Sequence, residues 1–514
     1  MSVKFRIRVP GVALLCLALA ACASAPPQRT QAPLPAAWFG PAGAAPDSAD
    51  GATLARWWLQ FDDPVLHGLV DAALSRNLDV QAALADLRLA RAQLRGASAA
   101  LWPVLDGSGQ GSRQWIDVGD ALDGEDNPLG DLIGTGSTAL DSWQLALQAS
   151  WELDLFGANR LRREAGALQL GAAQAQLVAA RLAVAGNLAQ GYVQARGLLA
   201  QIELLDAGID TAQGLERVAE ARFGLGEVTR LDVESAAAQV AALQAQRGDL
   251  EAALAETTFA LDTLTDRAPG STRTLLGDAT RVPGADAAIP VGQPVDLLRR
   301  RPDIIAAAAG LDAAERSALA SRRDLFPKLA LNASYGRSGL ALGDAISGTS
   351  TLRSAAAQIA FPWLDFGASR AAIDEADAQA DAGFVGLRQA IARALEEVEV
   401  ANAQRDARTR QLARRDEALA RGEQALHMAR RTYDVGLSDL DAVLQAQDGA
   451  LQARRDQLET RIALSTAQIA LYTALGGGWQ ADVGGHGGVD AVDADLQRHP
   501  VPDRIRQDGP DVGS

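Results

Sequence analysis

A strand-to-helix junction that occurs twice constrains this chain more than any other feature. Phe156-Gly157-Ala158-Asn159-Arg160 aligns with Phe366-Gly367-Ala368-Ser369-Arg370 at an offset of 210 residues. Leu101–Leu105 aligns with Leu325–Leu329 at an offset of 224 residues. We therefore divide the chain into a first repeat, residues 50–266, a linker, residues 267–289, and a second repeat, residues 290–476. Repeats this long are two copies of one large unit and not a short-period solenoid.

Each repeat contains segments in which apolar residues alternate with small or polar ones. The clearest are Trp143–Leu153, Leu325–Tyr335 and Ala355–Trp363. This alternation is typical of a half-buried sheet in a soluble domain, and also of strands in a membrane barrel. The chain offers four strand candidates, whereas the smallest single-chain barrels use eight. Since lipid does not tolerate an open sheet edge, four strands require partner chains, and three copies supply twelve.

The helices favour the membrane interpretation. Residues 158–222 contain no proline, and one continuous helix of this length would span ~98 Å. Two apolar tracks with seven-residue spacing allow that helix to pack on both sides. We therefore predict an α+β membrane protein: a trimeric 12-stranded β-barrel, with four strands per chain, continued by a long α-helical coiled-coil barrel. The strand-to-helix junctions are Phe156, Gly157, Phe366 and Gly367. A lipid-anchored coiled-coil scaffold is the alternative.

Charge and composition exclude several classes of protein. A net charge of −16 argues against nucleic acid as a partner. The four histidines show no metal-ligand spacing, and no phosphate loop or nucleophile elbow is present. We predict no enzyme, no cofactor and no metal site, so energy for transport must come from a partner.

The N-terminus has the pattern of a bacterial lipoprotein signal. A basic segment and a short apolar run end in Leu19-Ala20-Ala21-Cys22, so we expect residues 1–21 to be removed and Cys22 to be lipidated. An ordinary secretory signal with a chance cysteine is the alternative. Residues 22–50 are rich in Pro and Ala and predict an extended linker from the lipid. Residues 477–514 are rich in Gly and Asp and predict a disordered tail.

Four segments together resemble the TolC-like outer membrane factors, and most of all the nodulation-type lipoproteins that serve RND-type efflux pumps. They are Trp57–Ala83, Leu297–Leu319, Leu325–Leu329 and Tyr433–Gln447. The resemblance implies a homotrimer in the outer membrane, with its helices in the periplasm. It also implies a periplasmic membrane-fusion adaptor protein and an inner-membrane RND-type transporter as partners. The expected function is a passive exit duct for small molecules; an exit duct for type I protein secretion is the closest rival.

The resemblance also assigns roles to the two glycine-containing helical tips. Residues there are expected to dock with the adaptor, although they could be ordinary hairpin-loop residues. They are Gly224, Leu225, Gly226, Val228, Val435, Gly436, Leu437, Ser438 and Leu440.

Acidic side chains just after the second tip are candidates for a periplasmic gate. They are Asp439, Asp441 and Asp448, with Gln445 where the family commonly has Asp. Residues 441, 445 and 448 share one helix face. A solvated coiled-coil face is the alternative interpretation. Further back, Pro302 and Asp303 suit the first turn of a helix, so we interpret Arg299–Ile304 as architectural.

Overall fold

The computed structural model describes Pro35 and residues 37–40, 54–118, 136–284, 289–342, 346–361, 365–438 and 440–477. The chain separates into two units, Met1–Pro35 and Ala36–Ser514, and everything below concerns the second unit. Cys22, Asp439, most of the linker 22–50 and the tail beyond residue 477 lie outside the described residues.

The order of elements is the same in the two repeats, from a helix through two strands to a helical hairpin. The first contains η1 (Trp57–Phe61), α3 (Pro64–Arg76), α4 (Leu78–Ala99), β1 (Val104–Val118), β2 (Gly136–Leu153), α6 (Ala158–Gly224), α7 (Arg230–Leu264) and α8 (Ser271–Leu276). The second contains η3 (Pro294–Asp296), α9 (Leu297–Arg300), α10 (Pro302–Arg323), β3 (Lys328–Leu342), β4 (Ile346–Ala360), α11 (Ala368–Asp434) and α12 (Leu440–Ala474).

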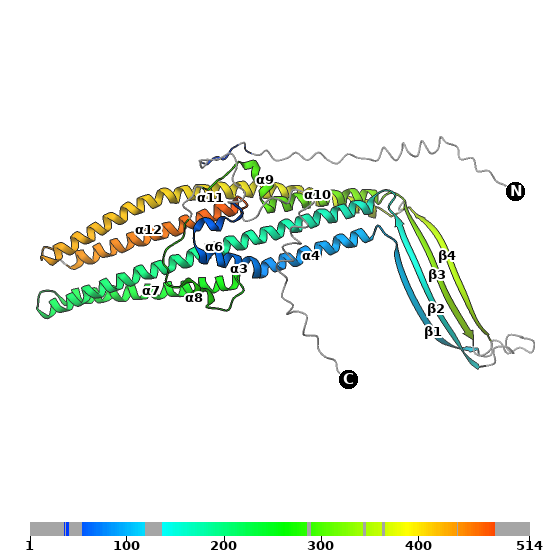
Figure 1. Cartoon of the computed structure of the whole chain (residues 1–514), viewed down its shortest axis with the longest axis horizontal. Coiled ribbons are helices and arrows are strands. Elements are labelled where there is room, and N and C mark those ends of the chain that lie inside the picture. Colours follow the sequence, from blue (N-terminus) through cyan, green and yellow to red (C-terminus); the bar gives the residue numbers. More distant parts are fainter. Residues whose placement is uncertain are drawn as a thin grey trace, which may run out of the picture. The chain divides into compact units, whose positions relative to one another are not determined.

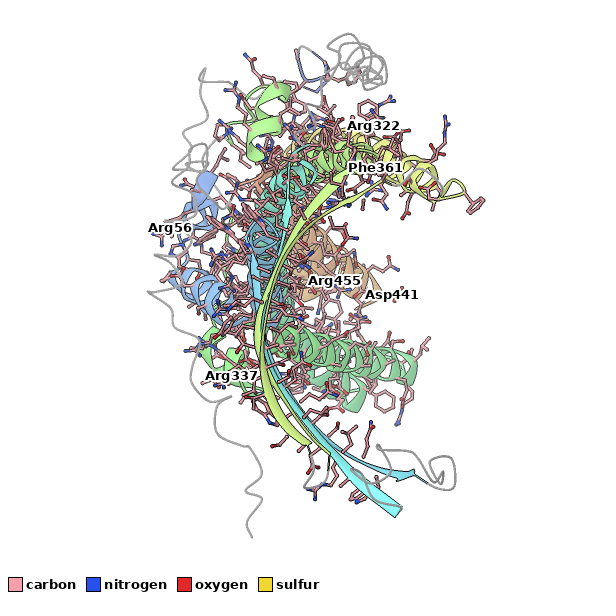
Figure 2. All side chains as sticks on the ribbon, turned by 90° about the vertical axis from the view of Figure 1, so that its right-hand side faces the viewer. Arg56, Arg322, Arg337, Phe361, Asp441 and Arg455 are labelled. Carbon is pink, nitrogen blue, oxygen red and sulfur yellow. The ribbon has the colours of Figure 1, made fainter. Side chains whose placement is uncertain are left out.

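The four strands form one antiparallel sheet in the order β1-β2-β3-β4. Within the described part of the chain, β1 and β4 therefore pair on one side only. Figure 1 shows the sheet at one end of the second unit, with the long helices running away from it. Seen from that end, the sheet is strongly curved (Figure 2).

The long helices confirm the fold class expected from the sequence. α6 and α11 have 67 residues each, or roughly 100 Å of helix. Each folds back onto a 35-residue helix, α7 or α12, to make two hairpins that lie side by side (Figure 1). Small residues allow close approach: a Cβ added at Gly186 of α6 would lie 2.8 Å from Thr473 Cγ2 of α12. No helix in the described ranges is both long and apolar enough to cross a membrane.

The main hydrophobic core lies where the short helices α3, α4 and α9 pack on the middle of the long ones. Trp57 and Tyr472 stack there with ring centroids 5.6 Å apart, and both are fully buried. Beside them, Asp63 Oδ2 accepts hydrogen bonds from Tyr192 Oη (2.8 Å) and Arg196 Nη2 (3.2 Å). Burial first, and then the Asp63 carboxylate, raise the pKa of Tyr192, so its hydroxyl remains a donor. This network joins the N-terminus of α3 to the middle of α6.

Candidate functional site

One face of the sheet is polar along its length. Strand register places Asp106, Gln110, Gln144, Gln148 and Gln358 on this face, because directly paired residues point to the same side. Serine hydroxyls hydrogen-bond across neighbouring strands: Ser112 with Ser142 (2.8 Å), Ser334 with Ser354 (2.7 Å) and Ser338 with Ser350 (2.8 Å). Val104, Leu140, Leu340 and Leu352 are the large apolar exceptions among the described side chains of this face. The face can therefore line an aqueous passage.

The opposite face is apolar and solvent-exposed in the single chain. Its exposed large apolar side chains are Leu105, Trp115, Trp143, Leu145, Leu147, Trp151, Leu331, Tyr335 and Ile359. A contiguous apolar surface of this extent marks contact with lipid or protein. The alternation of apolar and polar residues read in the sequence thus separates two chemically different faces.

The first strand-to-helix junction is held by a capping carboxylate that the sequence analysis did not single out. Gly157 has a positive φ of 80° and precedes α6. Asp154 accepts hydrogen bonds from the backbone N–H groups of Asn159 (3.0 Å) and Arg160 (2.9 Å). Phe156 stacks on Phe326, with ring centroids 4.7 Å apart. The junction therefore locks the first turn of α6 to the end of β2 and to the segment before β3.

The second junction reproduces the glycine and the carboxylate but differs at phenylalanine. Gly367 has a φ of 96°, and Asp365 accepts hydrogen bonds from the N–H groups of Gly367 (3.1 Å) and Ser369 (2.8 Å). Phe366 itself has a positive φ of 49° and is fully exposed. The sequence signal for these carboxylates was an Asp just before each Phe-Gly pair. Asp154 lies two residues before Phe156, and Asp365 lies one residue before Phe366.

The two helical tips are built alike. Gly226 and Gly436 have φ values of 78° and 74°, a conformation that glycine adopts without strain. Glu227 N donates to Arg222 O (2.9 Å), and Leu437 N donates to Thr432 O (2.8 Å). Both bonds are the closing bond of a Schellman motif, which satisfies carbonyls at the C-terminus of the preceding helix.

The predicted docking residues divide into exposed and buried members. Leu225, Val435 and Leu437 are 75%, 69% and 80% exposed, and Gly224, Gly226 and Gly436 are exposed as well. Val228 and Ser438 are half-buried. Leu440, in contrast, is only 3% exposed, so its side chain faces the interior of the tip.

A small hydrophobic cluster joins the two tips. It contains Ala219 of α6, Ala236 of α7, Tyr433 of α11, and Leu440 and Val443 of α12. The guanidinium of Arg222 lies over the Tyr433 ring, 4.3 Å from its centroid. The cluster fixes where the exposed tip residues stand relative to one another.

The start of α7 carries a capping box that sequence reasoning also missed. Thr229 N donates to Asp232 Oδ2 (2.7 Å), and Asp232 N donates to Thr229 Oγ1 (3.4 Å). The Thr229 side chain, and then its backbone, lower the pKa of Asp232. The Thr-x-x-Asp spacing after the tip glycine was the signal for it.

The gate candidates lie on the exposed side of α12. Asp441, Gln445 and Asp448 are all exposed, and Gln445 Nε2 donates to Asp441 Oδ2 (3.1 Å), as expected for one helix face. The Asp448 carboxylate instead accepts a hydrogen bond from Gln239 Nε2 of α7 (2.5 Å). Asp439 lies outside the described residues. Asp441 and Arg455 stand on the side toward which the sheet curves (Figure 2).

The interpretation of Arg299–Ile304 as architectural agrees with the contacts of Arg301. Its guanidinium donates to Asp303 (2.8 Å), pairs with Glu397 of α11 (2.6 Å) and donates to the carbonyl of Ala474 at the end of α12 (3.0 Å). Nearby, a stretch of the N-terminal linker rests on the helices. Trp38 Nε1 donates to Gly292 O (2.9 Å), and Glu399 accepts from the N–H groups of Phe39 and Gly40.

No cluster of side chains suited to a metal ion occurs among the residues that the structure describes.

Comparison with known proteins gives a consistent result. Residues 69–266 and 294–477 match the family described as outer membrane efflux protein. The chain is 29% identical to nodulation protein T of Rhizobium leguminosarum bv. trifolii over 394 residues, which cover 76% of this chain and 80% of that protein. It is 32% identical to the solvent efflux pump outer membrane protein SrpC of Pseudomonas putida over 360 residues, covering 70% and 73%. The solved structure of the outer-membrane channel OprN superposes with a TM-score of 0.76 at 28% identity, covering 88% of this chain and 99% of that one.

Proposed function

The chain belongs to the outer membrane efflux protein family and is a non-enzymatic outer-membrane channel with a periplasmic helical part; on that premise we propose that three copies form the exit duct of a tripartite efflux system. The duct passes small molecules passively from a periplasmic adaptor and an RND-type inner-membrane pump to the exterior. The relative SrpC is named for solvent efflux, which favours small apolar or amphipathic cargo over secreted protein.

The main observation in support of a trimer is that the sheet has two unpaired edges. β1 and β4 each pair on one side only in the described chain, and the sheet has one apolar and one polar face. In lipid the edges have to be paired, since unsatisfied backbone groups there cost several kcal/mol each. Three four-stranded sheets closed edge to edge give a 12-stranded barrel, with the apolar face toward lipid and the polar face toward water.

The tips supply the proposed contact with the adaptor. Leu225, Val435 and Leu437 project from loops whose backbone is fixed by the Schellman motifs and by the cluster around Tyr433. Leu440 acts here by positioning the second loop. Lipidation of Cys22 would give the chain a second membrane anchor in addition to the barrel.

The first test is the oligomeric mass of the full chain extracted in detergent, followed by its conductance in a planar bilayer. We expect three times the mass of one chain and discrete conductance steps. A monomer or dimer without conductance would overturn the duct and favour a lipid-anchored scaffold.

Asp441→Asn tests the proposed gate in the same bilayer. In a trimer Asp441 forms a ring of three carboxylates, which attracts cations; removing the charge should reduce the preference for cations over anions by several-fold. Asp278→Asn is the matched control, because Asp278 is fully exposed on a loop far along the chain from α12. An unchanged preference in Asp441→Asn would remove the gate role and leave the duct intact.

A further inference from the structure

The apolar face of the sheet ends in arginines. On β1, β3 and β4, the first charged side chain beyond the apolar run, counted from the helices, is Arg113, Arg337 or Arg353. Because the helices lie in the periplasm, these strand ends point to the cell exterior. The arginines therefore stand where the outward face of the barrel leaves the hydrocarbon of the outer leaflet.

Two of these arginines lack a carboxylate partner among the described residues. Asp141 is the only carboxylate on this face whose side chain the structure describes, and Arg113 holds it with two hydrogen bonds of 2.5 and 2.6 Å. Arg353 lies over the Tyr335 ring, 5.6 Å from its centroid, and Arg337 is exposed on β3. Figure 2 marks Arg337 on the sheet.

Register brings Arg337 and Arg353 together. Arg353 pairs with Tyr335 and Arg337 pairs with Thr351, so the two arginines are diagonal neighbours on one face. Diagonal pairs lie about 7–8 Å apart and remain within reach of long side chains. Two adjacent guanidinium groups repel each other unless an anion lies between them, and their fork geometry suits phosphate oxygens.

An apolar hollow adjoins this arginine pair. It has a volume of about 560 Å³, and Arg337 borders it. Its lining includes Gly107, Gly109, Leu145, Leu147, Tyr335 and Arg337. The glycines have no side chains to fill the hollow, and the leucines and Tyr335 give it apolar walls. A mainly apolar hollow that Arg337 borders, with Arg353 over the ring of its lining residue Tyr335, fits an amphiphile with an acyl chain and a phosphate.

We propose that Arg337 and Arg353 form a binding site for the phosphate of an outer-leaflet glycolipid, with an acyl chain of the same lipid in the adjoining hollow. The apolar hollow favours a lipid over a free phosphate ion. The site lies on the outside of the barrel, so it goes beyond the exit duct and does not depend on the gate.

The test uses the full chain in nanodiscs of neutral phosphatidylcholine that contain either diphosphorylated lipid A or its dephosphorylated form. Native mass spectrometry measures how much glycolipid stays bound. We expect the parent chain to prefer the diphosphorylated lipid by at least about tenfold. Arg337→Gln with Arg353→Gln should lose that preference and bind roughly 100-fold more weakly, about tenfold for each arginine. Arg414→Gln, an exposed arginine on α11, is the matched control and should bind as the parent does.

Three results would overturn the proposal. They are equal retention of the two lipids by the parent, a preference that persists in the double glutamine variant, and displacement of lipid A by millimolar inorganic phosphate, which would identify a free-anion site. If the glutamine variant does not assemble, Arg337→Lys with Arg353→Lys keeps the charge but loses the fork, and should show an intermediate preference. Conductance of the parent, measured separately, reports on the duct itself.

Discussion

At the scale of single residues, Arg301 shows how one side chain can join three helices. It stands before Pro302 at the start of α10, and its guanidinium reaches Glu397 of α11 and the carbonyl of Ala474, the last residue of α12. Its side chain is 10% exposed. Despite burial, which lowers it, the pKa of Arg301 is raised by Asp303 and Glu397, so the cation is stable there. The carbonyl at the end of α12 gains a charged donor where a helix leaves its carbonyls unpaired.

Replacing this arginine should loosen the middle of the molecule. We expect Arg301→Gln to lower the free energy of unfolding by about 2 kcal/mol, less than for a fully buried pair because Glu397 is half-exposed. Loss of the helical circular dichroism signal with urea measures the change. Arg299→Gln, an exposed arginine two residues earlier, serves as the control. Equal stability of the two variants would show that the contacts of Arg301 contribute nothing.

At the scale of elements, the sequence predicted the helices better than the strands. The proline-free run 158–222 became α6, which ends at Gly224. The strand expected at 143–153 in fact starts at Gly136, and the one expected at 325–335 runs from Lys328 to Leu342. The outer strand halves were missed because Gly, Ser and Thr on both faces give no apolar alternation. The capping carboxylates Asp154 and Asp365 were missed because a cap depends on local backbone geometry. The periodicity of apolar residues carries no information about that geometry.

The capping box at the start of α7 allows a prediction about that element. Thr229→Ala should weaken the first turn of α7 by about 1 kcal/mol, seen as faster amide hydrogen exchange at the tip. The lowered pKa of Asp232 adds a pH dependence: its stabilisation is present above the ordinary Asp value near 3.8 and is lost as pH falls through the lower folded value. Asp232→Asn should abolish this acid-side change.

Thr409→Ala provides the comparison for the tip variant. Thr409 is exposed in the middle of α11 and hydrogen-bonds to the carbonyl of Arg405 within its own helix. It should leave exchange at the tip unchanged. If Thr229→Ala also leaves it unchanged, the box does not hold the start of α7.

At the scale of the whole molecule, the duplicated unit explains why one chain carries both a membrane part and a periplasmic part. Each repeat supplies a strand pair, a junction and a hairpin, and the two sheets merge through the β2–β3 pairing. The two hairpins meet again at the tips, in the cluster around Tyr433. Duplication thus joins the two repeats at both ends of the unit, while β1 and β4 each keep one unpaired edge in the described chain.

The N-terminal linker should connect the proposed lipid anchor at Cys22 to the middle of the helices. A polyproline II chain from Cys22 to Trp38 spans about 50 Å. The far end of the linker is held at Gly292 and Glu399. Glu399→Gln removes the charge from the carboxylate that accepts the N–H groups of Phe39 and Gly40. Because hydrogen bonds to charged groups contribute about 1.5–3 kcal/mol, exchange at these two amides should accelerate by tenfold or more, with faster proteolysis of the linker. Glu396→Gln, exposed one turn earlier on α11, should change neither; equal exchange in the two variants would mean that Glu399 does not hold the linker.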